Sequence, residues 1–209
     1  MRPDELPAFL GGAAALAAAG SALALGALAA VRGRQALRAW PLVLTSLFFL
    51  ALTQYPFPDP STLACPAPRT EPLLIPFRFV GAAWSRWARR GLDPSWVMDV
   101  TVMAAAMNLV LCAAIGAALA RHAARARAAL LFGAALSLGV ELTQLTGLWG
   151  LYPCAYRQFD VDDLILNVAG VLIGFLAARR LGRRSGGTGP MPRSRRPDRA
   201  AAGDGGAQE

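Results

Sequence analysis

The sequence contains no lysine, a single histidine and few charged residues of either sign. Charged residues make up 16% of the 209-residue chain, whereas a typical soluble domain has about 25%. Hydrophobic residues make up 55%, and the mean hydropathy is +0.41. This scarcity of charge argues against a soluble globular domain and favours an integral membrane protein.

Motifs that bind nucleotides or activate a nucleophile are also missing. The sequence has no Walker loop, no Gly-x-Gly-x-x-Gly fingerprint and no Gly-x-Ser-x-Gly elbow. Three cysteines without a Cys-x-x-Cys pair, and one histidine at His122, give no metal-ligand pattern. Ser137 belongs to no nucleophile motif, and we expect its hydroxyl to bond the backbone of its own helix. We therefore expect no cofactor and no metal, and we favour a protein that is not an enzyme.

The excess of positive charge comes entirely from 21 arginines, which outnumber the 13 acidic residues and leave a net charge of +8. A pI near 10.9 is compatible with nucleic-acid binding. The arginines, however, stand at the ends of apolar runs, where membrane topology requires positive charge. We expect contacts with membrane lipids and none with nucleic acid.

Five apolar runs predict an all-α fold, a multi-pass transmembrane bundle of about five helices. A spanning helix needs about 20 mostly apolar residues. The runs cover residues 7–31, 40–55, 96–120, 128–148 and 161–178. The first is rich in Ala and Gly, but it is longer than the apolar core of a signal peptide, about 7–15 residues, so we expect it to be retained.

Arginine clusters orient these runs, because they follow the first, third and fifth of them. The clusters are Arg32, Arg34 and Arg38, then Arg121, Arg125 and Arg127, then Arg179, Arg180, Arg183 and Arg184. With five spans all three fall on one side, which the positive-inside rule makes cytoplasmic. We therefore expect the N-terminus outside, the C-terminus inside, and residues 56–95 and 149–160 outside. Trp40, Trp96 and Trp149 lie at predicted helix ends, as expected for interfacial indoles.

The segments between and after the spans have distinct compositions. Residues 73–90, LLIPFRFVGAAWSRWARR, mix apolar side chains with four arginines and predict a helix or re-entrant piece on the outer membrane surface; a solvated loop is the alternative. We divide the chain into a first helix with its loop (1–39), a transmembrane domain (40–180) and a tail (181–209). The tail is rich in Arg, Gly and Pro, and we expect it to be disordered and cytoplasmic.

Polar residues gather in the last two spans. Glu141 and Gln144 are three residues apart and share one face of the fourth span. Asp160, Asp163 and Asn167 follow at helical spacing along the fifth span, with Arg157 just before them. A short connection makes the two spans antiparallel neighbours, so we expect these polar faces to meet inside the bundle.

An ionisable residue within a span is costly, about 2.5–3.5 kcal/mol on insertion scales, and it faces the bundle interior or a wet cavity. For Glu141 and Asp163 we favour a ligand site. For Gln144 and Asn167, a role in cross-linking helices is an equally good explanation.

The motif of these residues resembles the signature of the VanZ-like family. Its positions are Glu141, Gln144, Arg157, Asp160, Asp163, Asn167, Gly170 and Gly174. Residues 74–77, Leu-Ile-Pro-Phe, and Asn108 with Gly116 resemble two upstream elements, although Ala114 replaces the proline expected there. Gly170 and Gly174 form a small-xxx-small pair that admits a close neighbouring helix. The resemblance implies a small multi-spanning protein, and the founding member is associated with low-level teicoplanin resistance.

The three cysteines have different expected environments. Cys112 lies in the middle of the third span, and we expect it to be a small packing residue. Cys65 and Cys154 lie in the two outer connections, where an oxidising exterior permits a disulfide. Two free thiols remain the alternative.

We expect a protein of the cell membrane that binds a lipid-linked or amphipathic ligand at the outer leaflet near Glu141, Arg157 and Asp163. The partner would be a lipid-linked envelope precursor or a glycopeptide. One alternative is a proton-coupled carrier that uses Glu141 and Asp163. The other is a non-catalytic membrane scaffold in which the polar residues only join helices.

Overall fold

The computed structural model describes residues 6–55, 57, 59–61, 63, 65, 71–91 and 100–186. Within these residues the chain is helical, and one isolated bridge is its only strand-like pairing. The elements are α1 (Leu6–Arg32), the 3-10 helix η1 (Arg34–Ala39), α2 (Trp40–Gln54), α3 (Arg78–Arg90), α4 (Val100–Leu119), α5 (Ala126–Leu145), α6 (Gly147–Gly150) and α7 (Val161–Gly186).

Five helices are long and apolar enough to cross a membrane, so the predicted multi-pass all-α fold is confirmed. Residues 96–99, predicted to begin the third span, lie outside the described residues. The fourth span ends at Leu145, earlier than predicted, because Gly147, Leu148 and Trp149 all adopt positive φ and turn the chain. α7 extends past residue 178 to Gly186, where its arginines lie near the negative end of the helix dipole.

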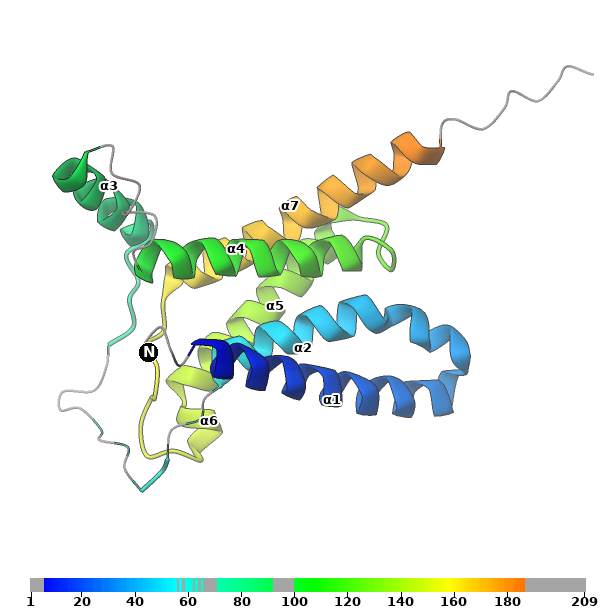
Figure 1. Cartoon of the computed structure of the whole chain (residues 1–209), viewed down its shortest axis with the longest axis horizontal. Helices are drawn as coiled ribbons and strands as arrows, with labels where there is room; N and C mark the ends of the chain where they lie inside the picture. Colours follow the sequence, from blue (N-terminus) through cyan, green and yellow to red (C-terminus); the bar gives the residue numbers. More distant parts are fainter. Residues whose placement is uncertain are drawn as a thin grey trace, which may run out of the picture.

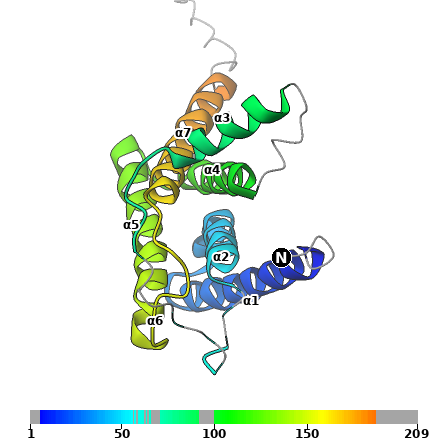
Figure 2. The same cartoon turned by 90° about the vertical axis from the view of Figure 1, so that its left-hand side faces the viewer.

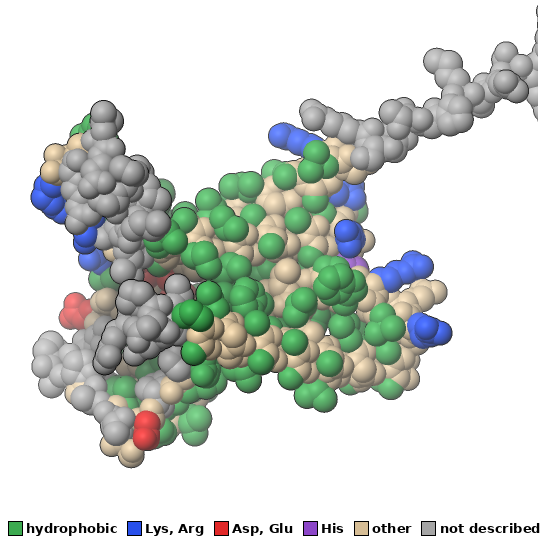
Figure 3. Space-filling view, viewed as in Figure 1, with side chains coloured by type: hydrophobic (Ala, Val, Ile, Leu, Met, Phe, Trp, Pro, Cys, Tyr) green, Lys and Arg blue, Asp and Glu red, His purple; other side chains and the backbone are tan. Residues whose placement is uncertain are grey.

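The five spans alternate in direction along the chain, so their connections fall at two ends of the bundle (Figure 1). One end, here the loop end, carries α3, α6, the connection 146–160 and the described residues of the connection 55–77. The other, here the arginine end, carries η1, residues 120–125 and the C-terminal part of α7. Figure 2 looks at the loop end and shows α3 leaving the bundle sideways beside α4. Arginine side chains gather at the arginine end (Figure 3).

The closest contact in the bundle is between α4 and α7. A Cβ atom added to Gly174 would lie 1.9 Å from the carbonyl oxygen of Ala113, and one added to Gly170 would lie 2.5 Å from that of Leu109. On the facing helix, a Cβ on Gly116 would lie 2.0 Å from the oxygen of Val171. Glycines on both helices thus bring the two backbones together, and the buried core forms around this contact.

α1 packs on α2 through a single stripe. Its buried residues recur every four positions, at Ala13, Ala17, Ser21 and Leu25. The ring of Phe9 stacks on that of Tyr55 with centroids 5.9 Å apart. The other faces of α1 are exposed and apolar, as expected for a helix that lipid surrounds.

A disulfide between Cys65 and Cys154 joins the two connections at the loop end, with Cα atoms 5.8 Å apart. Gly147, at φ 61°, permits this arrangement, since a Cβ there would lie 2.5 Å from the oxygen of Cys154. A second link lies nearby: the amide of Leu73 donates to the oxygen of Phe159 at 2.8 Å, and that of Val161 to the oxygen of Leu73 at 3.0 Å. The disulfide therefore ties the two connections together, and the bonds of Leu73 hold the 55–77 connection against the start of α7.

We predict that Gly174→Ala destabilises the protein by about 1–3 kcal/mol, because the added methyl group must push α4 and α7 apart. The measurement is thermal unfolding of purified protein in detergent. Gly139→Ala is the matched control, since a Cβ at this helical glycine of α5 meets nothing within 4 Å. Equal loss of stability in both variants would contradict the close-packing explanation.

Candidate functional site

The first turn of α7 is built by the acidic run at residues 160–163. The Oδ1 of Asp160 accepts a hydrogen bond from the amide of Asp162 at 2.9 Å, which caps the helix. Asp162 and Asp163 follow in the first turn, where negative side chains are favourable beside the positive end of the helix dipole. Local sequence therefore explains why α7 starts here and presents three carboxylates together.

Asp162 anchors α3 to α7. Its side chain is 5% exposed, and its two carboxylate oxygens accept from the amides of Phe77 and, at 3.2 Å, Phe79. These amides lie at the beginning of α3, where backbone N–H groups have no partner within the helix. The sequence motif named Asp160 and Asp163 but not this residue. The only signal for it was its place in the Asp-Val-Asp-Asp run.

Glu141 lies behind the first turn of α7 and is 1% exposed. Its Oε2 accepts a hydrogen bond from the amide of Asp160 at 3.0 Å. The buried carboxylate of α5 therefore pairs with a backbone amide at the start of α7. Glu141 thus fixes the position at which α7 begins against α5.

Gln144 and Arg157 both bind the end of α2. The Nε2 of Gln144 donates to the oxygen of Thr53 at 2.8 Å, and a guanidinium nitrogen of Arg157 donates to the same oxygen at 2.5 Å. Tyr156 donates to Gln54 beside them. Burial raises the pKa of the Tyr156 phenol above its ordinary value. Side chains from α5 and the 146–160 connection thus satisfy the carbonyl of Thr53, one of the last in α2.

A chain of polar contacts crosses the bundle deeper down. Asn108 of α4 donates to Asp163 at 2.7 Å, and Cys112 of α4 donates to Asn167 at 3.3 Å. Asn167 in turn donates to the hydroxyl of Ser137 on α5 at 3.0 Å. Ser137 therefore faces α7 as an interhelical acceptor, and the predicted bond to its own backbone is not the contact that the structure shows. The physical reason is the close approach of α5 to α7 beside Gly133.

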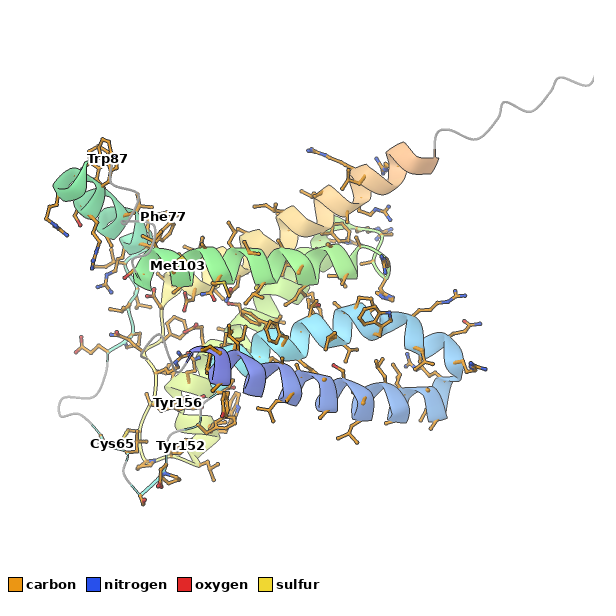
Figure 4. All side chains as sticks on the ribbon, in the orientation of Figure 1. Cys65, Phe77, Trp87, Met103, Tyr152 and Tyr156 are labelled. Carbon is orange, nitrogen blue, oxygen red and sulfur yellow. A yellow bond between two sulfur atoms is a disulfide. The ribbon has the colours of Figure 1, made fainter. Side chains whose placement is uncertain are left out.

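A cavity of about 400 Å³ opens between α3, α4 and α7 at the loop end. Asp160, Asp162 and Asp163 line it, and Arg78 and Thr101 contribute further polar groups. Its apolar walls include Phe79, Leu73, Leu166 and the alanines of α3 and α4. Figure 4 shows Phe77 at the junction of α3 and α4, next to this region. Arg78 was not among the predicted site residues, although it directly follows the Leu-Ile-Pro-Phe element.

The structure separates the predicted site residues into two groups. Asp160 and Asp163 line the cavity. Glu141, Gln144, Arg157 and Asn167 are not among its lining residues and instead hold neighbouring elements. Cys65, Tyr152 and Tyr156 gather at the loop end with the disulfide (Figure 4). In the part of the chain that the structure describes, no group of three or more His, Cys, Asp and Glu side chains is arranged to hold a metal ion.

Comparison with known proteins identifies the family of this chain. A family model described as VanZ/LLP1 matches residues 42–182, most of the chain. The matched residues include the whole polar motif and the cavity, and they exclude α1 and η1. No curated protein and no solved structure shows a significant match. The family match and the five apolar helices together establish that this chain is a multi-pass membrane protein of the VanZ-like family.

Proposed function

We propose that the cavity between α3, α4 and α7 binds the head group of an amphipathic, lipid-linked molecule of the cell envelope. One observation carries the proposal: three carboxylates, one arginine and one threonine line a cavity whose remaining walls are apolar. Such a lining fits a head group with a cationic amine or hydroxyl groups on one side and an apolar chain on the other.

Hydrogen bonding leaves part of the acidic lining available. Both oxygens of Asp162 bind the start of α3. Asp160 and Asp163 each use one side-chain oxygen within the protein, for the amide of Asp162 and for Asn108. Among the described residues, their second oxygens have no hydrogen-bond partner. An ammonium group placed between them would gain charge-assisted hydrogen bonds.

α3 supports a position for this cavity at the membrane surface. Phe79 and Ala82 line the cavity, whereas Val80, Trp84 and Trp87 lie on a different face of the helix and are 50%, 66% and 41% exposed. This amphipathic helix therefore turns Val80, Trp84 and Trp87 away from the cavity, where lipid would cover them. A ligand whose chain lies in the same lipid layer would reach the cavity from the membrane.

Two independent features favour placing the loop end outside the cell. The disulfide lies at the loop end, and disulfides persist in oxidising compartments. The arginine clusters lie at the opposite end, where the positive-inside rule places the cytoplasm. The proposal is therefore an outer-leaflet site in the cell membrane. Its connection to glycopeptide susceptibility rests on the association of the founding VanZ-like member with teicoplanin resistance.

A scaffold remains the second candidate, and a specific observation favours it. Glu141, Gln144, Arg157 and Asn167 all direct hydrogen bonds to backbone groups or to other helices. Interhelical hydrogen bonds contribute about 0.6–2 kcal/mol each, so such residues can hold a bundle together without any ligand. The two candidates differ in what they predict for Asp163.

We predict that Asp163→Asn lowers ligand binding and the effect of the protein on teicoplanin susceptibility by about tenfold while leaving the protein folded. The amide removes the charge but keeps an oxygen that can accept from Asn108. Glu141→Gln should instead reduce the yield of folded protein, since Glu141 is buried against the backbone of Asp160. Susceptibility, membrane expression and proton flux in vesicles are measured for each variant.

Asp59→Asn is the matched control, because Asp59 lies at the loop end but is exposed outside the cavity. If Asp163→Asn stays folded and fully active, the ligand-site proposal fails and the scaffold is favoured. Proton flux in the wild type that disappears in the Asp163 variant would favour a carrier.

The proposed orientation gives a separate prediction. A single cysteine placed at Ser61 should react with a membrane-impermeant maleimide in intact cells, whereas one placed at Gln35 should react only after the membrane is opened. Both positions are exposed, at the loop end and the arginine end respectively. Labelling is carried out with Cys112→Ala, so that the remaining native cysteines are the disulfide pair. The reverse labelling pattern would show that the loop end faces the cytoplasm and would contradict the proposed orientation.

A further inference from the structure

A second and larger cavity, of about 830 Å³, lies at the arginine end. Its polar lining comes from two regions that are far apart in the sequence. Arg32 is the last residue of α1, Gln35 and Arg38 belong to η1, and Arg121 and His122 belong to the turn after α4. The fold therefore brings three guanidinium groups to one cavity, although each cluster alone is explained by membrane topology.

The chemistry of this lining selects an anion. Among the described residues, no acidic side chain lines the cavity. Guanidinium groups bind phosphate through paired, charge-assisted hydrogen bonds. Leu28 and Trp40 add an apolar wall beside them. A cavity with several arginines and an adjoining apolar wall fits a phosphate group that carries an apolar chain.

The position of the cavity agrees with that ligand. Its residues lie where α1 and α4 end and α2 begins, at the boundary of three candidate spans. The indole of Trp40 is 55% exposed there, as is common for side chains at the level of lipid head groups. Basic pockets between transmembrane helices on the cytoplasmic side are known to hold anionic head groups. Figure 3 shows the arginine and histidine side chains gathered at this end.

We propose that the cavity formed by Arg32, Arg38, Arg121 and His122 binds the phosphate of an anionic lipid head group. The site is distinct from the acidic cavity at the loop end and does not rest on the function proposed for it. Arg32, Arg38 and Trp40 precede the residues 42–182 that the family model matches. The first helix and its connection therefore complete a site that the matched region supplies only in part.

The test measures lipid-dependent thermal stabilisation of the full chain in detergent. Phosphatidylglycerol is titrated against wild type and against the double variant Arg38→Gln with Arg121→Gln, and phosphatidylcholine serves as the zwitterionic lipid. We expect phosphatidylglycerol to stabilise the wild type and phosphatidylcholine to have little effect. The double variant should bind phosphatidylglycerol at least about tenfold more weakly, since it loses two guanidinium groups that form charge-assisted hydrogen bonds with phosphate.

Arg179→Gln with Arg183→Gln is the matched control. It removes the same charge from the same end, but these residues line a different cavity. Retained affinity in this control supports a specific site. Equal loss in both double variants would mean general attraction between the arginine end and anionic lipid, and would overturn the proposal, as would equal binding of the two lipids. Melting temperatures without lipid show that each variant is folded.

Inorganic phosphate identifies the source of the anion. If phosphate alone stabilises the wild type at millimolar concentration and competes with phosphatidylglycerol, the cavity recognises a soluble phosphate. If phosphate has no effect while phosphatidylglycerol does, the apolar wall is part of the site and the ligand is a lipid. Absence of stabilisation by either compound would refute phosphate binding here.

Discussion

The first turn of α7 is the junction on which the loop end of this protein depends. Glu141 accepts from the backbone of Asp160, Asp160 caps the helix, and Asp162 holds the beginning of α3. In a membrane, a backbone polar group without a partner costs several kcal/mol, so each of these bonds secures an element that lipid would otherwise destabilise. Placing charged side chains so close together is tolerable because most of them bind backbone amides.

This junction is possible only because α4 and α7 approach closely. Glycines at 116, 170 and 174 remove the side chains that would keep the two backbones apart. The short distance then lets Asn108 reach Asp163 and lets Cys112 reach Asn167, so that polar groups in the middle of the bundle are satisfied. The close packing is therefore also what satisfies these polar groups. A wider spacing would leave Asn108 without its partner Asp163 and the Oδ1 of Asn167 without Cys112 in an apolar interior.

The two cavities show how the same bundle separates opposite charges. Three carboxylates and a single guanidinium group, that of Arg78, line the cavity at the loop end, whereas three guanidinium groups and no carboxylate line the cavity at the arginine end. The apolar spans between them prevent these groups from pairing with each other. Each end therefore retains charge that can act on molecules at its own surface of the membrane, which is why two ligands of opposite character are proposed for one small protein.

The sequence by itself determined the membrane class, the five spans and the family, because apolar runs and motif spacing are local properties that survive without any knowledge of packing. It also placed Asp160 and Asp163 correctly in one helical turn. Only the tertiary structure decided which polar residues face a cavity and which hold helices together: Arg157 and Gln144 bind the end of α2, whereas Arg78 and Asp162 line the cavity. The physical reason is that periodicity along the sequence sets which residues share a helical face. Which groups that face contacts depends on the distance between helices, and this distance depends on glycines in two spans at once.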